Sequence, residues 1–163
     1  MLRRGQSEPG VEIRKAQTAD DAGAILDCLA AAFAPYRERY TPAAWLDTVL
    51  TPDSISRRLS EMCVFVAVAE GRIAGTIGCQ TDGAEGHLRG MAVLPEYQGT
   101  GLASALLRCA EEELRKGGAR RVTLDTTLPL TRAARFYVRH GYTASGRVRD
   151  FFGMQLFEYR KEM

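Results

Sequence analysis

The sequence lacks a long apolar run, a cysteine framework and an excess of charge of either sign. Its longest unbroken apolar run spans residues 62–69, far short of the roughly 20 residues that cross a membrane. Residues 1–10 contain two arginines but no apolar stretch, so they do not resemble a secretory signal. The 22 Lys and Arg against 20 Asp and Glu leave a net charge of +2, whereas a nucleic-acid binder normally has a stronger basic excess. We therefore expect neither a membrane nor a nucleic acid as a partner.

Cysteines are few and isolated: Cys28, Cys63, Cys79 and Cys109 form no CxxC pair and match no zinc spacing. Among small or apolar neighbours such cysteines behave as hydrophobes, which predicts reduced core residues of a cytoplasmic protein and no metal site. The glycines and prolines follow no period, and 45% of the residues are apolar, which excludes collagen-like and disordered chains. At 163 residues the chain suits one domain, expected at 11–163 after a flexible tail at 1–10.

Apolar periodicity and turn residues predict strands and helices in mixed order. The expected strands are residues 11–16, 63–69, 72–80, 87–94, 121–126, 142–148 and 152–159. The expected helices are residues 18–35, 43–50, 54–62, 100–116 and 131–140, and a glycine-rich loop is expected at 81–86. Mixed elements within one domain indicate an α/β or α+β sheet with helices on its faces.

The most informative segment is a glycine pair at the entrance of a helix, Gly99 and Gly101. Glycines there let the backbone approach a ligand, and the free N–H groups of the first turn favour an anion such as pyrophosphate. A P-loop is excluded because no Lys follows the glycines. The dinucleotide-binding fingerprint G-x-G-x-x-G/A fits both glycines, but its third position is Ser104. Asp125 lies where the ribose-binding acid of that fingerprint belongs. A dinucleotide-dependent oxidoreductase therefore stays an alternative.

A third template, Q/R-x-x-G-x-G/A, matches Gln98, Gly101 and Ala103 without adjustment. With the preceding segment 88–96 (LRGMAVLPE) and the later segment 131–142 (TRAARFYVRHGY), the chain resembles the GNAT superfamily of N-acetyltransferases over about residues 11–160. One departure is Leu130, where the family often has Asn, so a hydrogen bond to the cofactor arm or substrate must come from another residue.

The resemblance implies a single mixed α/β (α+β) domain whose central twisted sheet is mostly antiparallel, with about six to seven strands, splayed at the cofactor site and covered by helices on both faces. Gly90 breaks the side-chain alternation of its strand and is expected to form a bulge that splays the sheet. The resemblance implies acetyl-CoA as donor, held by two sets of backbone groups. Main-chain amides of the loop would bind the pyrophosphate: Gln98, Gly99, Thr100, Gly101, Leu102 and Ala103. The end of the preceding strand would pair with the pantetheine amides: Met91, Ala92 and Val93.

The resemblance also assigns roles to side chains. Tyr137 would be the general acid toward the departing thiolate, since a phenol stays protonated at neutral pH; the alternative is a packing tyrosine on an amphipathic helix. The general base would be His87 or Glu85, near the start of the strand that leads to the cofactor loop. Three aromatic residues, Tyr36, Tyr40 and Trp45, could line the acceptor pocket or only pack together.

The expected reaction is acetyl transfer to a primary amine of a small molecule or peptide, by direct attack in a ternary complex, because no cysteine nucleophile is evident. A non-catalytic acyl-CoA-binding sensor or scaffold is an alternative function. The chain could also form a homodimer.

Overall fold

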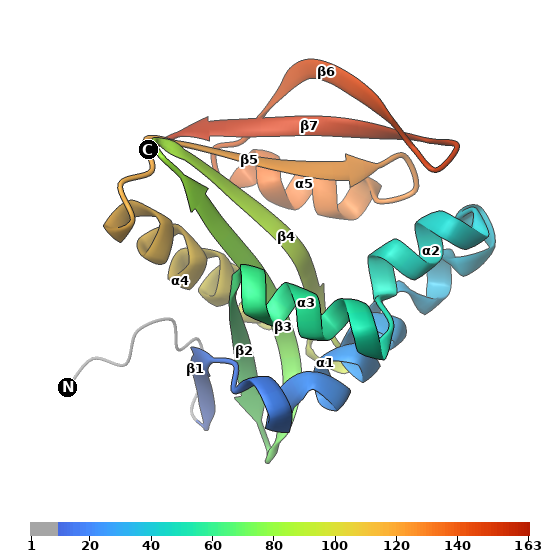
Figure 1. The fold of residues 1–163 in the computed structure, drawn as a ribbon, viewed down its shortest axis with the longest axis vertical. Coiled ribbons are helices and arrows are strands. Elements are labelled where there is room, and N and C mark those ends of the chain that lie inside the picture. Colours follow the sequence, from blue (N-terminus) through green and yellow to red (C-terminus); the bar gives the residue numbers. More distant parts are fainter. Residues whose placement is uncertain (1–9) are drawn as a thin grey trace.

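A single sheet of seven strands in the order β1-β2-β3-β4-β5-β7-β6 organises the computed structural model, which describes residues 10–163 except for the side chains of residues 18 and 19 (Figure 1). The expected tail at 1–10 therefore lies, but for Gly10, outside the described residues. The strands are β1 (Val11–Lys15), β2 (Cys63–Ala69), β3 (Arg72–Asp82), β4 (Glu85–Val93), β5 (Arg121–Thr127), β6 (Thr143–Phe151) and β7 (Met154–Glu162). The helices are α1 (Thr18–Phe33), η1 (Ala34–Arg39), α2 (Pro42–Val49), α3 (Pro52–Glu61), η2 (Pro95–Tyr97), α4 (Leu102–Lys116) and α5 (Thr131–Arg139).

Neighbouring strands are antiparallel except for β4 and β5, which are parallel. These two strands pair only from Glu85 to His87 on β4, and beyond that point they spread apart (Figure 1). The pairing of β3 with β4 shifts register opposite Gly90, whose φ is +69°, a value that favours glycine. The expected bulge, splay and mostly antiparallel sheet are thus confirmed.

Helices cover both faces of the sheet, as expected. On one face, a Cβ added to Gly75 of β3 would lie 2.7 Å from the Leu102 side chain of α4. On the opposite face, a Cβ added to Gly78 would lie 3.6 Å from Met62, which follows α3. Figure 1 likewise places α4 and α5 behind the sheet and α1 and α3 in front of it. No helix within residues 10–163 has the length and apolar character that crossing a membrane requires.

The expected ends of two hairpins were wrong. The predicted glycine-rich loop at 81–86 is a tight turn, because β3 continues to Asp82 and β4 begins at Glu85. The last two strands are longer than predicted and meet at Phe152 and Gly153, both with positive φ. The charged residues near this turn lie on an exposed edge hairpin, where a strand needs no apolar alternation.

A buried polar cluster joins α4 to the last strand and supports α5. The fully buried Tyr142 donates its hydroxyl to Glu111 Oε2 at 2.7 Å, and Lys161 Nζ lies 3.0 Å from the same oxygen. The Tyr142 ring packs edge-on against the ring of Tyr137, with centroids 5.7 Å apart. The cluster therefore helps to fix the position of Tyr137.

Changing Glu111 to Gln is expected to lower the free energy of unfolding by about 1–3 kcal/mol, because the Lys161 ammonium loses its charged acceptor in a partly buried setting. Urea denaturation followed by circular dichroism measures this change. Glu113→Gln on the same helix is the matched control: Glu113 pairs with an exposed lysine, Lys15, at 3.4 Å, so its change is expected to stay below about 1 kcal/mol. Equal losses in the two variants would contradict the prediction.

Candidate active site

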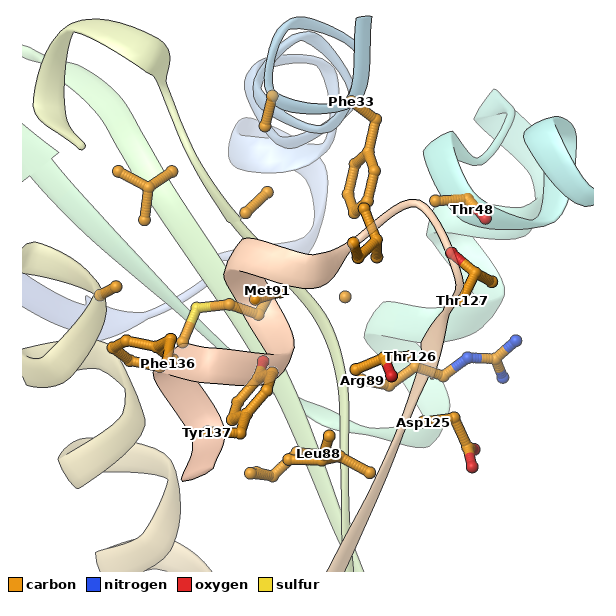
Figure 2. A pocket seen from close by; sticks show the side chains of 18 of the residues that line it. Phe33, Thr48, Leu88, Arg89, Met91, Asp125, Thr126, Thr127, Phe136 and Tyr137 are labelled. Atoms are coloured by element: carbon orange, nitrogen blue, oxygen red, sulfur yellow. The ribbon is translucent and has the colours of Figure 1, made fainter. Parts of the chain in front are cut away.

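The splay between β4 and β5 opens a cavity of about 690 Å³ (Figure 2). Its walls come from α1, η1, α2, α3, the two splayed strands, the loop before α4, α5 and the β6–β7 hairpin. Figure 2 shows two different ends: Leu88, Met91 and Phe136 surround Tyr137 on one side, whereas Arg89, Asp125 and Thr127 lie on the other. The cavity thus has one mostly apolar part and one polar, charged part.

The loop that enters α4 turns its backbone toward one part of this cavity. Gly99 and Gly101 have φ values of +79° and +90°, and a Cβ on Gly99 would meet no atom within 4 Å. Gly101 is the N-cap of α4 and offers no side chain to the first N–H groups of the helix, which lack intrahelical acceptors. Gln98 Nε2 donates to Val93 O at 3.2 Å, which ties the loop to the end of β4. This arrangement leaves main-chain donors and a helix dipole available to an anion.

The residues predicted to hold the cofactor fall into two groups. Seven line the cavity: Met91, Ala92, Val93, Gln98, Gly99, Gly101 and Ala103. Thr100 and Leu102 do not, because the Thr100 hydroxyl donates back to Tyr97 O and the Leu102 side chain is buried in the core. The loop follows the fourth strand of a mostly antiparallel sheet, which does not fit the parallel dinucleotide-binding unit that remained an alternative.

The end of β4 presents one unpaired edge to the cavity. Ala92 and Val93 pair with Thr76 and Gly75 of β3, but β5 no longer pairs with β4 beyond His87. Backbone groups of this stretch that face β5 therefore have no strand partner within the described part of the chain. An extended ligand with amide groups could add to this edge as a strand does.

Tyr137 lies on α5 with 6% of its surface exposed. Figure 2 shows its hydroxyl directed toward Met91 across the cavity, and it forms no hydrogen bond with any residue from 10 to 163. Burial raises the pKa of Tyr137 above its ordinary value. The rings of Phe136 and Tyr142 pack edge-on against it, at centroid distances of 5.3 and 5.7 Å. The structure thus holds a neutral phenol, with a free hydroxyl, in a fixed position.

His87 lies where β4 and β5 part, and its ring is held by β5. Its Nδ1 lies 2.9 Å from Thr123 Oγ1, and that hydroxyl donates to Gly86 O at 3.4 Å. His87 Nε2 is 3.8 Å from Asp125 Oδ2, beyond hydrogen-bond distance. Because the Thr123 hydroxyl donates to Gly86 O, its oxygen accepts from Nδ1–H, which leaves the lone pair on Nε2.

The pKa of His87 is lowered, chiefly by burial. The neighbouring carboxylate of Asp125 acts in the opposite direction, and the cations Arg89 and Arg149 lower the pKa further. The imidazole is therefore neutral at physiological pH. Glu85, the other predicted base, does not line this cavity: it is exposed and lies 3.9 Å from Arg121.

Only two of the three aromatic residues predicted for the acceptor pocket line the cavity. Tyr36 and Tyr40 line the cavity, and the Tyr40 hydroxyl lies 2.6 Å from Thr127 Oγ1 on β5. Trp45 does not line it; its ring packs edge-on against Tyr40 and under the guanidinium of Arg37. The packing alternative therefore describes Trp45 better.

Sequence reasoning missed four charged residues that line the polar part of the cavity, and it considered a fifth, Asp125, only as the ribose-binding acid of a dinucleotide site. The four are Asp47, Arg58, Arg89 and Arg149. Two ion pairs connect four of these five residues: Arg89 with Asp47 at 2.9 Å, and Arg149 with Asp125 at 2.7 Å. Strand alternation places Asp125 on the same face of β5 as Thr127, which also lines the cavity, and this signal could have assigned Asp125 to the site. Within residues 10–163 no group of three or more His, Cys, Asp or Glu residues is arranged to hold a metal ion.

Comparisons with known proteins agree on one family. The model of the acetyltransferase (GNAT) family matches residues 25–142. N-alpha-acetyltransferase 30 of Schizosaccharomyces pombe is 30% identical over 102 residues, which cover 58% of this chain and 68% of that protein. Aminoalkylphosphonate N-acetyltransferase of Salmonella typhimurium is 42% identical over 60 residues, which cover 37% of this chain and 39% of that protein.

The fold is likewise similar to a solved structure, the PaiA N-acetyltransferase of Thermoplasma acidophilum in complex with coenzyme A. The TM-score is 0.77 at 18% identity, with 94% of this chain and 99% of that chain covered. This likeness establishes the fold. The family model covers more than half of the chain and establishes family membership. The protein belongs to the acetyltransferase (GNAT) family.

Proposed function

We propose that this protein is an acetyl-CoA-dependent N-acetyltransferase that moves an acetyl group to a primary amine of a small molecule or peptide by direct attack in a ternary complex. The observation that carries the proposal is one continuous cavity that is lined by the glycine loop, the unpaired edge of β4, Tyr137 and His87. The names of the relatives support it: one is an N-alpha-acetyltransferase and another acts on aminoalkylphosphonates.

The residues present fit acetyl-CoA as the donor substrate. The free N–H groups around Gly101 suit its pyrophosphate, because they combine main-chain donors with the positive end of a 15-residue helix. The unpaired edge of β4 at 91–93 suits the amides of its pantetheine arm. An arm bound along this edge extends toward Met91, the residue to which the Tyr137 hydroxyl points.

Tyr137 acts as the proton donor to the leaving thiolate. The acceptor nitrogen forms a bond to the thioester carbonyl carbon, the carbon–sulfur bond breaks, and the electron pair stays on sulfur. The phenol proton then moves to that sulfur, so that the free thiol leaves. The nitrogen of the new amide gives up its extra proton, which returns Tyr137 to its neutral form directly or through water. Burial keeps Tyr137 protonated over the physiological range, and its hydroxyl is not committed to another acceptor within the described residues.

His87 acts as the general base. An alkylamine has a pKa near 10.4 and is protonated at neutral pH, so it must lose a proton before it can attack. The neutral His87 Nε2 accepts that proton, directly or through a water molecule, while Thr123 holds the other ring nitrogen. The charged neighbours Asp125 and Arg149 adjust its proton affinity.

A pH profile tests this assignment. Because the pKa of His87 is lowered and its neutral form is the base, kcat/KM for the acceptor should fall as pH drops through a midpoint below about 6.5. Asp125→Asn removes an anion that favours the protonated ring, so the midpoint should move to lower pH. Arg149→Met removes a cation that disfavours the protonated ring, so the midpoint should move to higher pH.

The opposite directions of these two shifts are expected only for a titrating group that is close enough to both side chains to feel their charges, as His87 is. Glu85→Gln is the control, since Glu85 lies outside the cavity, and its profile should match that of the unaltered protein. A midpoint that stays in place in both the Asp125 and the Arg149 variants would exclude His87 as the titrating base.

The function itself is tested by binding and turnover side by side. Calorimetry is expected to detect acetyl-CoA binding and no binding of NAD(P), and a panel of primary amines is expected to release free thiol from acetyl-CoA. Acetyl-CoA binding without thiol release from any amine would favour the sensor or scaffold alternative. Tight NAD binding without acetyl-CoA binding would favour the oxidoreductase.

A further inference from the structure

A guanidinium without a partner lies beside the β4 bulge. Arg58, near the end of α3, lines the cavity, and its Nη1 lies 2.5 Å from the position where a Cβ of Gly90 would be. Gly90 therefore has two roles: its positive φ forms the bulge, and its missing side chain leaves the space that Arg58 occupies. Within residues 10–163 the guanidinium has neither a hydrogen bond nor an ion pair.

The surroundings of Arg58 make this lack of a partner costly. Burial lowers its pKa to about 10; the cation Arg89 acts in the same direction and the carboxylate of Asp47 opposes it. Asp47, however, is 2.9 Å from Arg89 Nη2, and Asp125 is 2.7 Å from Arg149 Nη2. The carboxylates of this part of the cavity are thus already paired with other arginines, and Arg58 remains available to an external anion.

The position of Arg58 relates it to the acceptor rather than to the donor's phosphates. Gly90 is three residues after His87 on β4, a separation of roughly 10 Å along a strand. It precedes the stretch 91–93 and the glycine loop, which lie farther along the chain. A molecule whose amine lies between His87 and Tyr137 could place a second group against Arg58 only if the two groups are a few bonds apart.

A guanidinium presents N–H donors in a planar fork that matches the oxygens of a carboxylate or a phosphonate, and such pairs are stronger than neutral hydrogen bonds. We propose that Arg58 binds an anionic oxyacid group of the acceptor, so that the preferred substrates are short primary amines that carry a carboxylate or phosphonate. This inference rests on the proposed function and names the substrate class of the same cavity.

Three matched amines test the proposal: β-alanine, 2-aminoethylphosphonate and the neutral β-alaninamide. In thiol-release assays with acetyl-CoA, the unaltered protein is expected to prefer at least one of the two anionic amines over β-alaninamide by about tenfold or more in kcat/KM. Arg58→Met should reduce this preference by about tenfold, and Arg58→Lys should restore part of it. The neighbouring Arg57, which is exposed and lies outside the cavity, provides the matched control: Arg57→Met should keep the preference.

Three results would overturn the proposal. They are equal kcat/KM for the anionic and neutral amines in the unaltered protein, an equal fall in kcat/KM for both kinds of amine in Arg58→Met, or an Arg58→Met defect that affects only acetyl-CoA binding. A purely structural Arg58 would instead give a lower midpoint of thermal unfolding in Arg58→Met. We expect the midpoint not to fall, because the substitution breaks no hydrogen bond or ion pair within the described residues and removes a charge that burial disfavours.

Calorimetry separates this proposal from the proposed function. It measures binding of 2-aminoethylphosphonate and β-alanine to protein saturated with coenzyme A, which requires no turnover. Binding to the unaltered protein and weaker binding to Arg58→Met support the Arg58 site even if no amine is acetylated. If neither amine binds, the Arg58 site is wrong, whatever the turnover of other amines.

Discussion

Replacing Tyr137 by Phe is expected to lower the rate of acetyl transfer by about a hundredfold or more, the usual contribution of a general acid. The thiolate that leaves the thioester would then have to take its proton from solvent, from which the buried Tyr137 site is largely shielded. Single-turnover measurements of thiol release are the appropriate assay, because a slow product release would hide the chemical step.

The same substitution should leave the fold intact. The Tyr137 hydroxyl has no hydrogen-bond partner within the described residues, so its removal breaks no internal hydrogen bond, and the ring contacts with Phe136 and Tyr142 persist in Phe. Thermal unfolding and the Kd of coenzyme A should therefore change little. Tyr159→Phe, a tyrosine on β7 outside the cavity, is the control and should keep its rate. An unchanged single-turnover rate in Tyr137→Phe would exclude the acid role.

The parts of the fold that sequence predicted well depend on local features. The order of elements followed from apolar period and turn residues, and the strand at 63–69 matched to the residue. Gly90 indicated the bulge because it interrupts a strand, and Gly99 with Gly101 indicated a helix entrance that accommodates positive φ. Each of these signals lies within a few residues of the feature that it predicts.

The residues that sequence missed become neighbours only through tertiary structure. Arg58 lies in a polar helix segment, RRLSE, where an arginine is expected to face solvent. Its proximity to Gly90 requires α3 to pack against the bulge of a strand about thirty residues later in the chain. The choice between His87 and Glu85 was likewise undecidable from sequence, because only the divergence of β4 from β5 after His87 determines which of the two meets the cavity.

The glycine at the entrance of α4 provides the second large effect. Gly101 has a φ of +90°, in the region that side chains disfavour, so Gly101→Ala costs about 1–2 kcal/mol of strain or forces the backbone to rotate. Rotation would turn the first N–H groups of α4 away from the direction in which a pyrophosphate binds. Loss of one or two charge-assisted hydrogen bonds predicts a rise of about tenfold to a hundredfold in the Kd of coenzyme A, measured by calorimetry.

A glycine after the other end of α4 has a similar positive φ and provides a control whose substitution causes similar backbone strain. Gly118 has a φ of +95° and open space where a Cβ would lie, so Gly118→Ala should lose a similar amount of stability. It follows the C-terminus of α4, where the helix dipole is negative and no anion is expected, so its coenzyme A affinity should stay unchanged. If both variants lose stability equally and only Gly101→Ala loses affinity, the anion is held by the amides at the helix entrance. Equal affinity in the two variants would mean that these amides do not bind the cofactor, and the assignment of the loop would be wrong.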